Sequence, residues 1–145
     1  HWGELDYLII DAPPGTGDEP LSVCQLIKDV TGTIIVTTPQ EISLLDVQKS
    51  ISFIKQLNVP LTGIIENMSG FTCPHCGKSV AIFKTGGGER IASTLGISFL
   101  GSIPIEPGIV EASDEGKPFL SSDAETEAGK KFREVVDKIM KITQK

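Results

Sequence analysis

Two cysteines separated by two residues carry the most distinctive chemistry in this 145-residue chain. Cys73 and Cys76 enclose a proline and a histidine, and in a tight turn both thiolates can bind the same metal centre. Such a pair supplies half of a four-ligand site, and the sequence holds no second pair. The remaining cysteine, Cys24, stands among apolar residues at helical spacing, where we expect it to be buried. The missing ligands would come most simply from a second copy of the chain across a two-fold axis.

The residues alone leave other interpretations of the cysteine pair open. His75 could act as a ligand, but we expect its side chain to point away from the metal. A structural zinc knuckle, a redox dithiol and an accidental pair are the competing possibilities. A thioredoxin-type dithiol lies between a strand and the start of a helix, and no obvious helix begins after Gly77. Metal binding is therefore favoured, although the pair itself does not separate zinc from iron–sulfur.

A second set of candidate residues follows apolar runs that we expect to be strands. Asp11 comes directly after the run Leu5–Ile10, where Walker-B acids hold Mg²⁺ directly or through water. Gly15 and Gly17 would let backbone N–H groups approach a phosphate closely. Asn67 offers a hydrogen-bond donor beside an acceptor, which matches the N6 and N7 edge of adenine. Each of these residues alone is also typical of an ordinary turn.

The predicted strands place these residues at one edge of the sheet. Ligands of open parallel sheets bind at the carboxyl ends of the strands. Those ends carry residues 11–15, 38–40 and 67–69 and the turn Pro104-Ile105-Glu106. Their common location favours a nucleotide site over four unrelated turns.

The sequence contains no phosphate-binding Walker A loop. Residues 77–79 have the Gly-Lys-Ser ending of that motif, but the glycine required five residues earlier is replaced by Thr72. The run of three glycines at 86–88 lacks the following lysine and serine. We therefore expect the N-terminal strand and the P-loop to be missing, and this chain alone to bind ATP poorly and to hydrolyse it negligibly.

Strands and helices are predicted to alternate along a single domain, residues 1–145. This order predicts an α/β fold with a mostly parallel sheet and helices on both faces. Residues 69–87 interrupt the alternation and are expected to be a functional, metal-binding insertion. The expected strands are Leu5–Ile10, Thr33–Thr37, Leu61–Glu66 and Phe99–Ile103. The expected helices begin with one capped by Asp18 and continue as Ser43–Leu57, Gly88–Leu95 and Thr126–Ile142. The sides expected to face the core are Leu44, Val47, Ile51 and Ile54 in the second helix, and Phe132, Val135, Val136 and Ile139 in the last.

Composition excludes several classes of partner. The net charge of −6 argues against nucleic acid, because binding to the phosphate backbone requires a basic surface. No apolar run is long enough to cross a bilayer, and we expect no signal peptide. The last predicted helix combines lysines with an apolar side, as membrane-surface helices do, but its acids make packing on the sheet the favoured alternative. Three cysteines do not resemble a secreted disulfide framework, so we expect a cytoplasmic protein.

Taken together, these segments resemble the Mrp/ApbC family of P-loop ATPases in the MinD/ParA superfamily, which act as iron–sulfur cluster carriers. The resemblance rests on residues 2–7, the run Asp11-Ala12-Pro13-Pro14-Gly15-Thr16-Gly17-Asp18, residues 37–41 and 66–71, and the cysteine motif at 73–77. It implies a homodimer, or a heterodimer of close homologues, that passes its cluster to apo-proteins. Ala12, where the family usually has leucine, is a minor departure.

The resemblance also implies roles for individual residues. Cys73 and Cys76 would hold a bridging [4Fe–4S] cluster together with their symmetry mates, and zinc at the same cysteines is the alternative. Asp11 would be the switch II acid near Mg²⁺, and Gly15 would sense the γ-phosphate of ATP. Asn67 would contact adenine, and Pro104, Ile105 and Glu106 would close over the base. The Walker A lysines and the switch I aspartate of the family are not in this sequence. A zinc-stapled dimerisation module and a MinD/ParA-like partitioning ATPase are the two rival functions.

Overall fold

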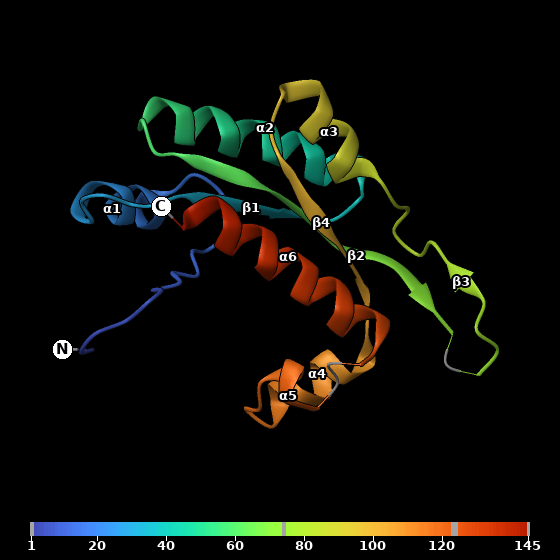
Figure 1. Cartoon of the computed structure of the whole chain (residues 1–145). Coiled ribbons are helices and arrows are strands. Elements are labelled where there is room, and N and C mark those ends of the chain that lie inside the picture. Colours follow the sequence, from blue (N-terminus) through green and yellow to red (C-terminus); the bar gives the residue numbers. More distant parts are fainter. Residues whose placement is uncertain (1, 74, 123–124, 145) are drawn as a thin grey trace.

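β2 (Leu61–Thr72) is the central strand of a four-stranded sheet in the computed structural model, which describes residues 2–73, 75–122 and 125–144 (Figure 1). β1 (Thr33–Thr37) and β4 (Phe99–Ile105) pair with β2 in parallel, one along each edge. β3 (Ser79–Val80) pairs antiparallel with the far end of β2. The predicted parallel arrangement is confirmed for these three long strands, and β2 continues six residues beyond its expected end at Glu66.

Two helices cover one face of the sheet. α2 (Glu41–Gln56) and α3 (Gly87–Leu95) pack on β1 and β2, with Ile64 completely buried at the centre of this core. The predicted inner side of α2 is confirmed, since its buried residues are Leu44, Val47, Ile51 and Ile54. α3 ends where expected, at Gly96 in the left-handed conformation that commonly stops a helix.

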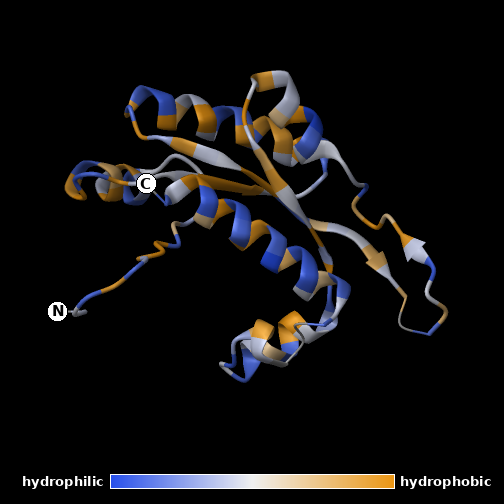
Figure 2. Ribbon diagram, in the orientation of Figure 1, coloured by the Kyte–Doolittle hydropathy of each residue, from blue (hydrophilic) through white to orange (hydrophobic). Residues whose placement is uncertain are grey.

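A single long helix covers the opposite face. α6 (Glu127–Thr143) packs Val135 against Ile65, Leu100 and Ile103, and its outer side is largely hydrophilic (Figure 2). The hydroxyl of Thr126 accepts a hydrogen bond from the Gly129 N–H at 3.0 Å and caps the start of α6. Phe132, expected to face the core, is 38% exposed. Two short helices, α4 (Pro107–Asp114) and α5 (Phe119–Ser122), connect β4 to α6.

The N-terminal segment corrects the sequence prediction. Leu5–Ile10 was expected to be a buried strand, but it belongs to no strand and its apolar side chains are exposed, with Ile9 at 78%. A strand forms only where a neighbouring strand supplies backbone partners, and this run pairs with none of β1–β4. The next helix, α1 (Asp18–Leu26), has no buried residue, so Cys24 is only partly covered. Gly17 occupies its N-cap position in place of the expected Asp18.

No helix among the described residues is long and apolar enough to span a membrane.

Candidate metal half-site and nucleotide cleft

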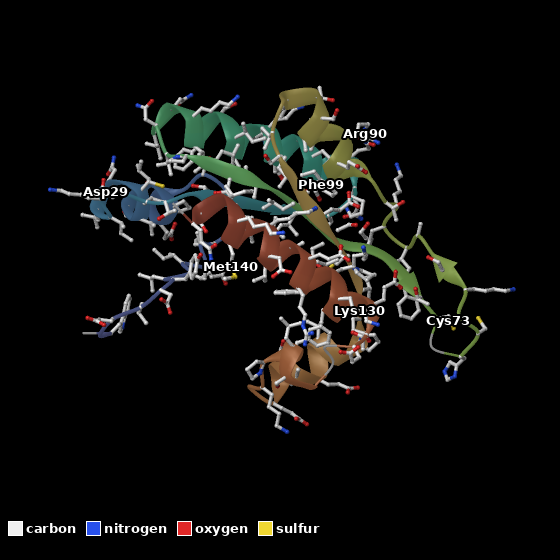
Figure 3. The ribbon with its side chains drawn as sticks, viewed as in Figure 1. Asp29, Cys73, Arg90, Phe99, Lys130 and Met140 are labelled. Atoms are coloured by element: carbon white, nitrogen blue, oxygen red, sulfur yellow. The ribbon has the colours of Figure 1, made fainter. Side chains whose placement is uncertain are left out.

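The cysteine pair lies at the tip of a hairpin that projects from the end of the sheet (Figures 1 and 3). We call this hairpin, residues 69–87, the cysteine hairpin; Pro74 in its tip lies outside the described residues. Its arms pair through Phe71 with Val80 and Thr72 with Ser79. The turn is closed by two backbone hydrogen bonds, from Cys73 N–H to the Lys78 carbonyl at 3.0 Å and from Gly77 N–H to the Cys73 carbonyl at 2.9 Å.

The turn places both thiols within reach of a ligand from outside the chain. Cys73 is partly exposed, Cys76 is exposed, and neither is in a disulfide. The backbone N–H groups of His75 and Cys76 and the thiol of Cys76 donate to the Cys73 sulfur, and these hydrogen bonds lower the pKa of the Cys73 thiol. The thiolate is the form that binds zinc and iron, so the turn favours a metal ligand. His75 takes part through its backbone in this network.

Within the described ranges, no three or more histidine, cysteine, aspartate or glutamate side chains are grouped so that they could hold a metal ion. The turn therefore offers two thiolates, and tetrahedral zinc or an iron–sulfur cluster would draw its remaining ligands from outside the described residues.

A buried glutamate at the base of the hairpin was missed by the sequence reasoning. Glu66 is completely buried, and its carboxylate accepts hydrogen bonds from the Ser69 hydroxyl, from Gly86 N–H at 2.8 Å and from Gly88 N–H at 2.6 Å. An acidic residue at the end of an apolar strand was the available signal, because a buried carboxylate must have hydrogen-bond donors around it. The sequence did not indicate that these donors come from the other end of the hairpin.

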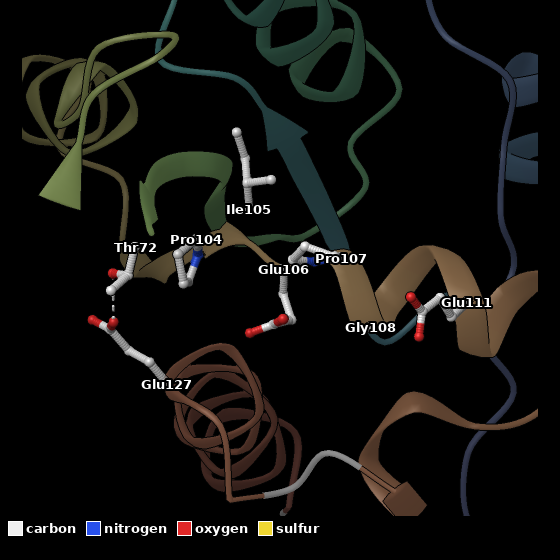
Figure 4. Close-up of a pocket in the computed structure, with 8 residues that line it drawn as sticks. All are labelled: Thr72, Pro104, Ile105, Glu106, Pro107, Gly108, Glu111 and Glu127. Atoms are coloured by element: carbon white, nitrogen blue, oxygen red, sulfur yellow. Dashed lines mark hydrogen bonds between the residues drawn. The ribbon is translucent and has the colours of Figure 1, made fainter. Parts of the chain in front are cut away.

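Beside the hairpin lies a cavity of about 480 Å³, which we call the acidic cleft. Three carboxylates and one hydroxyl provide its polar lining, and Thr72 Oγ1 donates to Glu127 Oε2 across it at 3.2 Å (Figure 4). Ile105 points away from Glu127, whereas Glu106 extends toward the start of α6 (Figure 4). The lining residues come from the ends of β2 and β4, from α4 and from the start of α6: Thr72, Pro104, Ile105, Glu106, Pro107, Gly108, Glu111 and Glu127.

The structure brings together only part of the predicted nucleotide site. Pro104, Ile105 and Glu106 line the cleft as a group. Asn67 does not line it; this residue pairs in register with Ile103, and its side-chain oxygen accepts from the Met68 N–H at 2.9 Å. Asn67 also opens an irregularity of β2 that extends to Phe71.

Asp11 and Gly15 lie apart from the cleft lining, in the exposed N-terminal segment. The expectation that they share one sheet edge with Pro104–Glu106 is not met, because the run before Asp11 does not join the sheet. Gly15 does adopt a positive φ of 101°, a conformation that suits glycine. The roles of Asp11 and Gly15 in binding Mg²⁺ and phosphate stay predictions.

The charge of the cleft determines which part of a nucleotide it suits. The carboxylates of Glu106, Glu111 and Glu127 can accept hydrogen bonds from an amino group such as N6 of adenine. The same carboxylates would repel a triphosphate at close range. A lining of this charge suits a group that donates hydrogen bonds and disfavours a polyphosphate.

Sequence comparison relates the chain to iron–sulfur carriers. Residues 1–140 match the ParA family model, described as the NUBPL iron-transfer P-loop NTPase. An iron–sulfur cluster carrier protein of Methanocaldococcus jannaschii is 56% identical over 139 residues, which make up 96% of this chain and 47% of that protein. A protein of the same description from Saccharolobus solfataricus is 48% identical over 144 residues, 99% of this chain and 49% of the relative. The chain spans about half the length of the curated relatives it matches.

Solved structures confirm the predicted fold class. A nucleotide-binding protein from Archaeoglobus fulgidus, in complex with ADP, superposes with a TM-score of 0.70 at 39% identity, covering 88% of this chain and 54% of the other. The MinD cell division protein of Aquifex aeolicus gives a TM-score of 0.72 at 21% identity, over 96% of this chain and 55% of that one, which is a likeness of fold alone. Both comparisons support an α/β sheet of the MinD-like P-loop type.

Proposed function

Because the chain belongs to the ParA family of NUBPL-type iron-transfer P-loop NTPases, we propose that it carries the cluster-binding part of an iron–sulfur cluster carrier. In this proposal Cys73 and Cys76 bind a [4Fe–4S] cluster together with the same two cysteines of a second copy or of a close homologue. The cluster is cargo, which is passed on to apo-proteins. The observation that carries the proposal is the pair of accessible thiols held in one turn at the tip of the cysteine hairpin.

Three features support a cluster over a protein-only role. The hydrogen bonds to the Cys73 sulfur favour its thiolate, the form that binds iron. The tip stands clear of the sheet, so a second hairpin could approach it without displacing the core (Figure 3). The relatives from Methanocaldococcus jannaschii and Saccharolobus solfataricus are named iron–sulfur cluster carrier proteins.

We further propose that the acidic cleft receives the base of an adenine nucleotide. Pro104, Ile105 and Glu106 would close over the base, with Asn67 reaching it from within the neighbouring strand β2. Asp11 and Gly15 would act on Mg²⁺ and on the phosphates, whose charge Mg²⁺ neutralises when it is bound. Residues 1–145 would then be the C-terminal part of an ATP-binding domain, with residues 69–87 as its metal-binding insertion. A reducing compartment such as the cytoplasm would keep both cysteines as thiols.

Anaerobic reconstitution with iron and sulfide tests the metal half of this proposal. The full-length protein should take up half a [4Fe–4S] cluster per chain, with the broad visible absorption and brown colour of such clusters. Cys73→Ser and Cys76→Ser should each abolish uptake, because each removes one of the two ligands that the chain offers. Cys24→Ser is the matched control and should leave uptake unchanged, since Cys24 lies on α1, outside the hairpin.

Zinc provides the result that would overturn the proposal. Tight, stoichiometric zinc binding under the same anaerobic conditions, with no cluster uptake, would identify a zinc-stapled dimerisation module. Co-sedimentation with anionic vesicles, together with no cluster uptake, would favour a MinD-like partitioning ATPase.

A further inference from the structure

We propose that Glu66 is a positioning residue that fixes the direction in which the cysteine hairpin leaves the sheet. The value of that direction for cluster binding rests on the proposed function. Neither the cysteine pair nor the acidic cleft gives this buried carboxylate a role.

The carboxylate of Glu66 binds both arms of the hairpin at once. Ser69 belongs to the outgoing arm and donates its hydroxyl to Oε1. Gly86 belongs to the returning arm and donates its N–H to the same oxygen at 2.8 Å. Gly88, in the first turn of α3, donates its N–H to Oε2 at 2.6 Å. A single side chain thus joins the two ends of the hairpin to each other and to a helix that packs on the sheet.

Glu66 is itself rigidly placed. Its backbone pairs in register with Thr37 on β1 and with Ser102 on β4, so strands flank it on both sides. Ile64 and Ile65, the two residues before it, lie in the two opposite cores of the domain. The carboxylate is therefore anchored at the centre of the sheet, and the groups that it binds are held in a fixed position relative to that centre.

The backbone beyond Glu66 does not by itself fix the direction of the hairpin. Regular pairing of β2 with β4 is interrupted between Asn67 and Phe71, where Met68 and Gly70 have positive φ angles of 57° and 82°. An irregularity of this kind bends a strand and changes the direction of the residues beyond it. Side-chain contacts are then needed to select one direction for the outgoing arm, and the Ser69–Glu66 hydrogen bond lies within this irregular stretch.

Close packing at the returning arm limits the other directions that the hairpin could take. A Cβ on Gly87 would lie 2.6 Å from the Pro39 carbonyl oxygen, and one on Gly88 would lie 3.1 Å from the Glu66 Cβ. The start of α3 therefore packs closely against Pro39, which follows β1, and against Glu66, and at Gly87 there is no room for a side chain. Buried carboxylates need all their hydrogen-bond donors, so displacement of either arm would leave Glu66 partly unsatisfied. The structure thus favours one hairpin direction strongly.

A fixed direction matters for a cluster that two hairpins share. Four sulfurs from two chains must converge on one cluster, and each hairpin that is already oriented loses less conformational entropy when the cluster binds. Glu66 would act through the hairpin on cluster retention without touching the cluster.

The first test measures the hairpin direction without any metal. In a full-length variant with Cys24→Ser, Cys73→Ser and Lys55→Cys, and with any cysteine outside these 145 residues also replaced by serine, nitroxide labels on Cys76 and on position 55 of α2 report one distance by electron spin resonance. We expect one narrow distance distribution, and clear broadening when Ser69→Ala or Glu66→Gln is added. Ser69→Thr restores a hydroxyl and should restore the narrow distribution. Ser113→Ala, which removes a hydroxyl hydrogen bond to the Ile109 carbonyl on α4, is the matched control and should have no effect.

The second test uses the intact cysteines and a reconstituted cluster. Ser69→Ala should keep the cluster absorption spectrum but lose the cluster to an iron chelator about tenfold faster, with rescue by Ser69→Thr. An unchanged distance distribution in Ser69→Ala would overturn the inference, and a broadened one with unchanged cluster loss would overturn the link between hairpin direction and cluster retention. If Glu66→Gln does not fold, the two Ser69 variants decide the question. Failure of the wild type to take up a cluster would refute the proposed function, while the distance measurement would still test the role of Glu66.

Discussion

The cysteine turn and the acidic cleft are neighbours in the chain, since Thr72 lines the cleft and precedes Cys73, yet the two are built differently. The turn is made by one short segment, and the hydrogen bonds that close it join residues 73–78. The cleft is made by the ends of β2 and β4, by α4 and by the start of α6. A locally built site depends on its own turn, whereas an assembled site depends on the core that holds its elements together.

A substitution that removes core volume should have the largest effect, and it should affect the acidic cleft, whose elements the core holds together, more than the cysteine turn. Ile64→Ala deletes a completely buried side chain between α2, α3 and the sheet, and we expect it to lower the free energy of unfolding by about 2–5 kcal/mol. Val36→Ala on the exposed side of β1 is the control and should cost no more than about 0.5 kcal/mol. Urea denaturation of both variants gives these values.

Hydrogen exchange in Ile64→Ala then shows whether the cysteine turn opens by itself. Amides of the β2–β4 ladder should exchange faster, because they exchange through global opening. The Cys73 and Gly77 amides, which close the turn, should keep their wild-type rates if the turn opens by local fluctuation. Acceleration of the turn amides in proportion to the core would contradict the contrast between a local and an assembled site.

The same contrast explains which features could be predicted from the sequence. The spacing of Leu44, Val47, Ile51 and Ile54 specifies a helix side by itself, and the structure confirms it. The cysteine pair is likewise a local pattern. The N-terminal run Leu5–Ile10 has the composition of a buried strand, but a strand also needs neighbours, and composition does not reveal them.

Glu66 shows the same limit inside the site. Two of its three hydrogen-bond donors, Gly86 and Gly88, lie at least twenty residues away in sequence. No spacing rule connects a glutamate at a strand end to glycines at the start of a later helix. The fold class could be predicted because strand and helix periods are local, and the hairpin anchor could not because it depends on a long-range contact.

A substitution in the cleft tests which end of the nucleotide it receives. Glu106→Ala should weaken ADP binding to the full-length protein about tenfold or more, because a hydrogen bond to a charged group contributes about 1.5–3 kcal/mol. Isothermal titration calorimetry measures this affinity. Glu115→Ala is the control, since the Glu115 carboxylate pairs with Lys117 at 2.7 Å outside the cleft lining, and its ADP affinity should match the wild type. Tighter ADP binding by Glu106→Ala would indicate that the phosphates lie in the cleft and that Glu106 repels them.

The smallest effect is expected at the contact that joins the two regions. Thr72→Val keeps the side-chain shape but removes the hydrogen bond to Glu127, which is 3.2 Å long and exposed. The unfolding free energy should fall by less than about 1 kcal/mol, because water replaces an exposed partner. If the hairpin direction is set by Glu66, cluster retention and ADP affinity should each change by less than about twofold. A parallel loss of both would instead identify the Thr72–Glu127 contact as the coupling between nucleotide and cluster, and the cysteine turn would then depend on the cleft.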